Sequence, residues 1–335
     1  MSVTTSLLSN WGAVLSTQNL PKGAEMDVIS RWLLIIRASV FPMTLFSGLI
    51  GGLLAVGAED ARFGLFAWSV VGLLVAHAAN NMINDWFDVA GGVDTDGYVR
   101  TVYAPHPILS GLISKKGLVA AIAVANLVDL WILIHLVEAR GWPVVFFALA
   151  GLFISVFYVA PPLKLKHRGL GEPGVAIVWG PLMIGGTYYV TTGSAPLWVF
   201  LASLPYAILV TTVLFGKHVD KHDSDKAKGI RTLPVLLGKD KALLWTRWMM
   251  SSYFVLVVGL VLAGVVGGWC LLVLFALPRL RETLETFREP PPAQPPPGYP
   301  LWPLWYVAWA FRLNRRAGGL FVLGLMIDAV IPFPL

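Results

Sequence analysis

The segment "FGLFAWSVVGLLVAHAANNMINDWFDVAGGVDTDG" (63–97) joins a long apolar run to a dense group of polar side chains. Residues 63–79 carry no charged side chain. Carboxamides and carboxylates then follow in quick succession, at Asn81, Asn84, Asp85, Asp88, Asp94 and Asp96. A charge near the centre of a membrane helix costs about 2.5–3.5 kcal/mol, so such residues are usually functional. The segment therefore predicts a membrane-spanning helix that ends in a cluster of oxygen ligands.

The composition of the whole chain agrees with a membrane protein. Of 335 residues, 56% are hydrophobic and only 13% are charged, whereas soluble domains carry roughly 25% charged residues. The mean hydropathy is +0.71. Apolar windows near the length of about 20 residues that spans a bilayer fall at 31–56, 64–86, 117–137, 143–160, 174–192, 196–217, 242–263, 265–279 and 317–333. They are too long and too regular for strands, so we expect an all-α polytopic membrane protein with about nine transmembrane helices.

The domain organisation follows from these windows. Residues 1–30 are expected to form an N-terminal cytoplasmic segment without the features of a signal peptide. Residues 31–333 are expected to form one transmembrane domain. Within it, 280–316 contains "REPPPAQPPPGYPLWPLWYVAW" (288–309), whose prolines and aromatic residues predict an extended linker at the membrane interface. The single cysteine, Cys270, excludes a disulfide framework.

The basic residues predict the orientation of the chain in the membrane. With the N-terminus inside, the outer loops hold only Arg62 and Arg140, and the inner loops hold the large majority of the lysines and arginines. This bias obeys the positive-inside rule and places the acidic segments on the cytoplasmic side. It also accounts for a pI near 9.4, so the basic excess does not imply binding to nucleic acid.

The first acidic cluster has the spacing of a binding site. Asn81, Asp85 and Asp88 recur at intervals of four and three residues and so share one helix face; Asn84 joins them. The following "GGVDTD" (91–96) breaks the helix and returns Asp94 as a loop ligand. Mg²⁺ prefers hard oxygen ligands and shares its octahedron with phosphate oxygens and water. We therefore expect Mg²⁺ to bind Asn81, Asp85, Asp88 and Asp94.

A second acidic cluster ends the sixth apolar window. The segment "FGKHVDKHDSDKAKGIRTLPVLLG" (215–238) supplies three more candidate ligands, Asp220, Asp223 and Asp225. Both clusters end a span at the inner side, which suggests two four-helix repeats followed by a last helix. Sites of proteins with such repeats lie between the halves. Two facing clusters could each hold a metal ion and clamp one diphosphate between them.

Basic residues near the clusters are candidate partners of that diphosphate. The loop "FYVAPPLKLKHRGLGEP" (157–173) supplies Lys164, Lys166 and Arg168. Further cations are Arg100, Lys217 and Lys221. The same loop also carries an aromatic side chain, Tyr158.

These motifs resemble the UbiA superfamily of intramembrane prenyltransferases from about residue 30 to 333. The resemblance rests on "NMINDWFDVAGGVD", "YVAPPLKLKHRGLGEP" and "KHVDKHDSDKAKGIRTLPVLLG". It implies nine helices around a central cavity, Mg²⁺-dependent diphosphate binding and a lateral opening to lipid. Asn81, Asp85, Asp88 and Asp94 match the first motif, so the resemblance implies for them a metal and diphosphate role. That motif is most similar to the menaquinone-branch enzymes that prenylate 1,4-dihydroxy-2-naphthoate.

The second motif departs from the family pattern of two aspartates four residues apart followed by glycine. Asp225 and Gly229 fit the pattern, but Lys221 occupies the earlier aspartate position. Asp220 lies one residue upstream, about 100° round a helix. Three alternatives remain: the helix unwinds to present Asp220, Lys221 reaches the diphosphate as a cation, or Asp223 compensates.

The expected function is Mg²⁺-dependent transfer of a polyprenyl group from an allylic diphosphate to an aromatic acceptor, with release of pyrophosphate. Asp85, Asp88, Asp220, Asp225 and Tyr158 are the residues expected to act in catalysis. One alternative is a terpene cyclase on the same scaffold, which needs no aromatic acceptor. Another is a secondary transporter of an anionic solute. Clustering of the acidic residues at one membrane side argues against transport, because transporters bind their substrates near the midplane.

Overall fold

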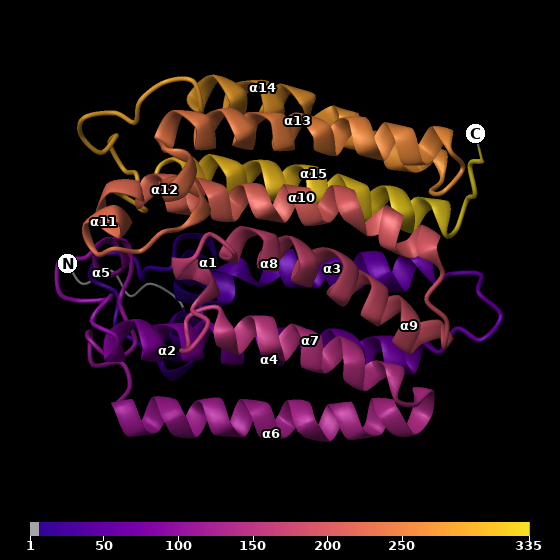
Figure 1. Cartoon of the computed structure of the whole chain (residues 1–335), viewed down its shortest axis with the longest axis horizontal. Coiled ribbons are helices and arrows are strands. Elements are labelled where there is room, and N and C mark those ends of the chain that lie inside the picture. The colour runs from indigo at the N-terminus through magenta and orange to yellow at the C-terminus, as the bar shows by residue number, and fades with distance from the viewer. Residues whose placement is uncertain (1–6, 335) are drawn as a thin grey trace.

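The computed structural model describes residues 7–334, and helices are the only regular elements among them (Figure 1). The long helices run side by side along one common direction. The prediction of an all-α fold is confirmed. The long elements are α3 (Phe41–Leu54), α4 (Phe63–Ala90), α6 (Lys115–Arg140), α7 (Pro143–Phe157), α10 (Leu197–Asp220), α13 (Lys239–Leu262) and α15 (Tyr306–Asp328).

Two further rods are built from consecutive helical pieces. The first consists of α8 (Gly171–Ile177), η3 (Val178–Gly185) and α9 (Gly186–Thr192). Its middle piece, η3, is a π-helix that contains Pro181, a residue that has no N–H to donate to the preceding turn. The second rod joins η4 (Gly268–Ala276), a 3₁₀ helix, to α14 (Leu277–Thr286).

The remaining helices are short and lie at one end of the bundle. This end, at the left of Figure 1, is called the motif end because both acidic motifs lie there. It carries α1 (Leu7–Thr17), α2 (Val28–Ile35), η1 (Ala38–Val40), α5 (Val99–Tyr103), η2 (Leu165–His167), α11 (His222–Ala227) and α12 (Leu233–Leu237).

Four helices are individually long and apolar enough to cross a bilayer, namely α4, α6, α10 and α13. The pair formed by α2 and the η1–α3 segment makes a fifth if it counts as one span, although it bends by 62°. These helices make the protein an integral multi-pass membrane protein. The predicted number of nine spans stays a prediction, because the other rods are shorter or divided.

Two predicted boundaries need correction. The predicted linker 280–316 is shorter, because α14 continues to Thr286 and α15 begins at Tyr306. The last predicted span, 317–333, accordingly starts earlier and ends at Asp328. Charged residues such as Arg312 and Arg315 hid the start of α15 from a hydropathy criterion, although the helix runs through them.

The two sides of the bundle differ in packing. The main core joins α10, α13, η4 and α15, and its fully buried side chains include Tyr206, Tyr253 and Phe321. Close approach of α10 and α15 depends on Gly216, where a Cβ atom would lie 2.9 Å from the backbone nitrogen of Val307. On the other side, α6 is peripheral, with only 11% of its most apolar window buried. A cavity of about 760 Å³ lies between these two sides.

Candidate active site

The turn after α4 places Asp94 beside the helix that it follows. Gly92 adopts a positive φ of +70°, which glycine tolerates without steric cost. The backbone N–H groups of Val93 and Asp94 then both donate to the Asp88 carbonyl, at 2.8 and 2.9 Å. The glycine pair and these two bonds fold the chain back, so Asp94 rejoins the end of α4.

The second motif contains the same turn. Gly229 has a φ of +69°, and the N–H of Ile230 donates to the Asp225 carbonyl at 2.9 Å. Val93 and Ile230 pack together with Tyr98 in one small apolar cluster. The matching turns agree with the predicted repeat, and their contact brings the two motifs face to face.

A lysine ties the two turns together. The Nζ of Lys228, in the second motif, donates to the carbonyl oxygens of Gly92 and Val93 and, at 3.1 Å, to the Thr95 hydroxyl. The same ammonium lies 4.2 Å from the ring centroid of Tyr98. The two halves of the chain thus form one continuous wall at the motif end.

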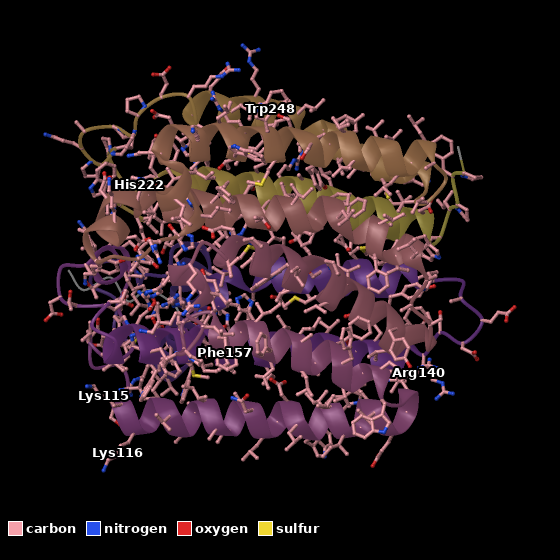
Figure 2. All side chains as sticks on the ribbon, viewed as in Figure 1. Lys115, Lys116, Arg140, Phe157, His222 and Trp248 are labelled. Atoms are coloured by element: carbon pink, nitrogen blue, oxygen red, sulfur yellow. The ribbon has the colours of Figure 1, made fainter. Side chains whose placement is uncertain are left out.

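The motifs enclose a small polar pocket beside the large cavity. The polar pocket is lined by Arg37, Asn84, Asp88, Asp94, Arg100, Tyr103, Tyr158, Lys166, Lys217, His218 and Lys221. Five of these residues also line the large cavity, namely Arg37, Asn84, Tyr103, Tyr158 and Lys217. Figure 2 shows nitrogen and oxygen atoms gathered at the motif end, while carbon dominates the rest of the bundle interior. A charged pocket therefore adjoins an apolar chamber.

Asp85 lies behind the pocket and is fully buried. Arg37 makes a two-pronged contact with it, and the Arg37 Nε–Oδ2 distance is 3.1 Å. Arg100 Nε and His106 Nε2 lie 3.4 and 3.3 Å from its Oδ1. Arg37 can reach Asp85 because the chain breaks between α2 and η1, where Arg37 has a φ of +53°. Asp85 thus orients two arginines that line the pocket.

Asp88 pairs with the loop that follows α7. The ammonium of Lys166 lies 3.0 and 2.9 Å from its two carboxylate oxygens. Lys166 is itself buried, and both residues line the polar pocket. The pair joins the first motif to the loop "YVAPPLKLKHRGLGEP" (158–173).

Asp94 differs from the other acidic residues of the first motif. It is buried, yet neither of its carboxylate oxygens accepts a regular hydrogen bond from any described residue, and the same holds for Asn84 Oδ1. Burial raises its pKa, but the neighbouring His106 and the charge of Lys221 outweigh that effect and lower it. Asp94 is therefore ionised and has free oxygen lone pairs, which is costly for a buried group without a ligand.

The donor set of the first motif fits a divalent cation. Single atoms of Asp85, Asp94 and His106 lie within 4.8 Å of one another. His106 acts here as a hydrogen-bond donor and not as a metal ligand. Its Nδ1 accepts the backbone N–H groups of Ile108 and Leu109, which leaves the proton on Nε2. The free oxygens of Asp94 and Asn84, with Asp88 beside them, form a hard-oxygen set of the kind that Mg²⁺ prefers.

The second motif presents a cation to the pocket. Tyr98 donates its hydroxyl proton to Asp225 Oδ1, and the ammonium of Lys221 lies 3.5 Å from the same oxygen. Burial raises the pKa of Asp225, but Lys221, His218 and the Tyr98 hydrogen bond together lower it. Of the two residues, only Lys221 lines the polar pocket. Of the three alternatives for this motif, the geometry matches the one in which Lys221 faces the substrate.

Asp220 and Asp223 were predicted as metal ligands, and the structure corrects both assignments. Asp220 accepts the backbone N–H groups of Tyr306 and Val307, at 2.9 and 3.0 Å, and so caps the start of α15. The Asp223 side chain is 85% exposed and pairs with His222. α10 stays helical through Asp220, so its side chain points about 100° away from that of Lys221.

We expect Asp220→Ala to lower the free energy of unfolding by about 1–3 kcal/mol, because two buried N–H groups lose a charged acceptor. Turnover per folded molecule should remain close to that of the wild type. Thermal unfolding in detergent and a turnover assay on the same sample measure both quantities. Asp223→Ala, which removes the same charge from an exposed position, is the control. Lost turnover at unchanged stability would return Asp220 to the active site.

Other predicted residues divide into those near the pocket and those away from it. Arg168 is exposed and donates to the Pro162 carbonyl, and neither it nor Lys164 lines the pocket. Asn81 donates to the Ile36 carbonyl at 2.9 Å and lines the large cavity instead. Tyr158 lies at the junction of the two hollows.

Several pocket residues were missed in the sequence analysis. Arg37 is a lone charge inside an apolar window, a signal that could have identified it. Glu172 and His218 form a buried pair at 2.6 Å, and His218 Nε2 lies 3.5 Å from the Tyr158 hydroxyl. No pattern in the sequence connects these two residues, because they belong to α8 and α10.

Together, the helical bundle, the apolar cavity and the charged pocket beside it define an integral membrane protein with an amphiphilic site. The chain belongs to the UbiA prenyltransferase family, whose model matches residues 44–287. It is therefore a prenyltransferase. This confirms the resemblance seen in the sequence motifs.

Two curated relatives share about a quarter of their residues with this chain. The 1,4-dihydroxy-2-naphthoate octaprenyltransferase of Bacillus subtilis is 24% identical over 246 residues, which cover 71% of this chain and 76% of the relative. The 2-carboxy-1,4-naphthoquinone phytyltransferase of Synechocystis is 28% identical over 234 residues, covering 68% and 73%. Both names describe transfer of an isoprenoid chain to a naphthalene ring.

Solved structures share the fold at lower identity. A UbiA homologue from Aeropyrum pernix in its apo form superposes with a TM-score of 0.65 at 16% identity, covering 86% of this chain and 98% of that one. A UbiA homologue from Archaeoglobus fulgidus bound to GPP and Mg²⁺ gives 0.57 at 14% identity, covering 88% and 99%. These likenesses support the fold alone.

Proposed function

We propose that the protein transfers a polyprenyl group from an allylic diphosphate to a bicyclic aromatic acceptor of the 1,4-dihydroxy-2-naphthoate type, with Mg²⁺ as its cofactor. The observation that carries this proposal is the polar pocket, rich in cations and in free acidic oxygens, that opens onto an apolar cavity. A prenyl diphosphate has the same division between a polyanionic head and an apolar tail.

The basic side chains of the polar pocket bind and orient the diphosphate. Arg37 and Arg100 are held by Asp85, and Lys166 is held by Asp88. Such fixed cations stabilise the negative charge that develops on a departing diphosphate without having to reorganise. Asp94, Asn84 and Asp88 are the residues that would hold Mg²⁺, which would neutralise more of that charge when bound.

Tyr158 and the cavity wall shield the reacting carbon. Tyr158 borders both hollows, so its ring stands where the carbon–oxygen bond of a bound prenyl diphosphate would break. The cavity continues past the ring pair of His77 and Trp179, whose centroids are 5.3 Å apart. Aromatic faces attract an allylic cation, and the apolar wall keeps water from intercepting it.

The acceptor class is inferred from the relatives and from the cavity. Both curated relatives carry names of enzymes that act on naphthalene derivatives. A cavity of about 760 Å³ falls in the range of roughly 300–1,000 Å³ that is common for ligand sites. It accommodates a bicyclic ring beside the reacting end of a prenyl chain, with the rest of the chain directed into the bilayer.

The motif end is proposed to face the cytoplasm. Figure 2 shows Lys115 and Lys116 at the motif end of α6 and Arg140 at the opposite end. The loops that follow α4, α7 and α10 at the motif end are also rich in basic residues. An excess of lysine and arginine in short loops marks the cytoplasmic side.

The proposed function is tested with purified protein, farnesyl or geranylgeranyl diphosphate, and 1,4-dihydroxy-2-naphthoate. Pyrophosphate and a prenylated product should form only when both substrates and Mg²⁺ are present, and EDTA should stop the reaction. A cyclic hydrocarbon formed from the diphosphate alone would instead establish the cyclase. Absence of pyrophosphate release with every acceptor and chain length tried would refute both.

A further inference from the structure

We infer that Lys221 occupies the place of a second divalent cation, so that the polar pocket binds a prenyl diphosphate with one metal ion instead of two. The inference rests on the proposed function and specifies how its substrate is held. Two facing acidic motifs would supply ligands on both sides of a diphosphate. In this chain the two sides of the pocket carry opposite charge.

The first-motif side has ligands to offer. Among the described residues, neither Asp94 carboxylate oxygen has a regular hydrogen bond, although His106 Nε2 lies 3.4 Å from Oδ2, and Asn84 Oδ1 has no hydrogen-bond partner. Asp88 adds a carboxylate that lines the pocket and shares its two oxygens with the ammonium of Lys166. This side can hold one divalent cation.

The second-motif side has no equivalent set among the described residues. Within the second motif, Asp225 is the only described acidic residue buried close to the pocket, and it does not line the pocket. Its Oδ1 accepts from Tyr98 and lies 3.5 Å from the Lys221 ammonium, which leaves Oδ2 as its one oxygen without a hydrogen-bond partner among the described residues. The two other aspartates of the motif, Asp220 and Asp223, point elsewhere.

The ammonium of Lys221 is fixed rather than mobile. It lies 3.5 Å from Asp225 and 4.6 Å from the ring centroid of Tyr98, and the side chain is only 6% exposed. Tyr98 and Asp225 therefore hold Lys221 much as a carboxylate pair would hold a metal ion. Lys217, one helical turn earlier on α10, lines the same wall.

The charge balance of the pocket favours this arrangement. Five basic side chains but only two carboxylates line it, with Asp85 and Asp225 behind them. Each phosphoryl group of a bound ligand adds roughly one to two negative charges, which these basic side chains and one divalent cation can neutralise together. A second divalent cation beside Lys221 would meet an ammonium at short range, where like charges repel strongly.

The test counts bound metal ions directly. The full chain is purified in lipid nanodiscs, saturated with farnesyl thiodiphosphate, a poorly reactive analogue, and titrated with Mn²⁺ under electron paramagnetic resonance. We expect one tightly bound Mn²⁺ per wild-type chain. Two bound ions in the wild type would overturn the inference.

Substitutions at Lys221 test whether this residue determines the number of bound metal ions. Lys221→Asp creates a carboxylate pair with Asp225 and should raise the count to two, whereas Lys226→Asp, the same charge change at an exposed position, should leave it at one. Lys221→Gln should keep one Mn²⁺ but weaken binding of inorganic diphosphate in EDTA roughly 10- to 100-fold. A count that stays at one in Lys221→Asp, or unchanged metal-free binding in Lys221→Gln, would remove Lys221 from this role.

The outcome is separable from that of the proposed function. If the protein binds the analogue and releases pyrophosphate in the transfer assay, but with two Mn²⁺ ions, only the inference fails. If it binds the analogue under no condition, the proposed function fails first.

Discussion

Asp94→Asn should reduce prenyl transfer roughly 10²- to 10³-fold while leaving the folded protein at least as stable as the wild type. Asp94 is ionised and buried, and no described side chain gives its oxygens a regular hydrogen bond. Removing that charge therefore takes away a metal ligand, and the one ion-pair contact that it weakens is the 3.4 Å approach of His106 Nε2 to Asp94 Oδ2. The measurements are the initial rate of pyrophosphate release at saturating Mg²⁺ and thermal unfolding in the same detergent.

A matched control lies two residues further along the same loop. Asp96 is exposed, so Asp96→Asn loses the same charge outside the pocket and should retain wild-type turnover. If Asp94→Asn keeps more than about half of the wild-type rate, Asp94 does not hold the metal ion. If it unfolds at a clearly lower temperature, Asp94 has a structural partner that the geometry does not show.

Asp85→Ala, unlike Asp94→Asn, should act mainly by lowering the stability of the folded protein. Its removal leaves Arg37, Arg100 and His106 facing one another in a buried site. Removing one partner of a buried ion pair costs about 3–5 kcal/mol, because the remaining charge stays buried without compensation. We expect poor yield and a strongly lowered unfolding temperature, with no turnover in the fraction that folds.

A second substitution separates the two consequences of losing Asp85. Arg37→Leu in the Asp85→Ala background removes one of the uncompensated charges and should restore part of the unfolding temperature. It should not restore turnover, because Arg37 also lines the polar pocket. A normal unfolding temperature in Asp85→Ala alone would contradict the description of Asp85 as the centre of a buried ion-pair cluster.

The sequence predicted the helix face and the turn of the first motif because their signal is local, but it did not predict that Asp85 binds arginines behind the pocket or that Asn81 bonds the Ile36 carbonyl. A helix face repeats about every 3.6 residues, so the spacing of Asp85 and Asp88 and the glycines that follow already contain the turn that returns Asp94. The partners of these acids come from distant segments: Arg37 lies 48 residues before Asp85, and Lys166 lies 78 residues after Asp88. Helical periodicity carries no information about such pairs.

The second motif shows more clearly what could not be predicted from the sequence. Helix geometry predicted that Asp220 and Lys221 point in different directions, but not which of them faces the pocket. That choice depends on α15, whose first two N–H groups require an acceptor and find one in Asp220. Likewise, hydropathy located the apolar windows but could not reveal the bend at Arg37 or the π-helix around Pro181.

The matching turns at Gly92 and Gly229 have the same backbone shape although the two motifs present different charges to the pocket. Both turns close on the carbonyl of an aspartate, and both place their next residue in one shared apolar cluster. The backbone conformation of each turn thus does not depend on whether the neighbouring side chains are positively or negatively charged. A substitution that exchanges an acidic for a basic side chain beside either turn should therefore change the charge of the pocket without changing the backbone around it.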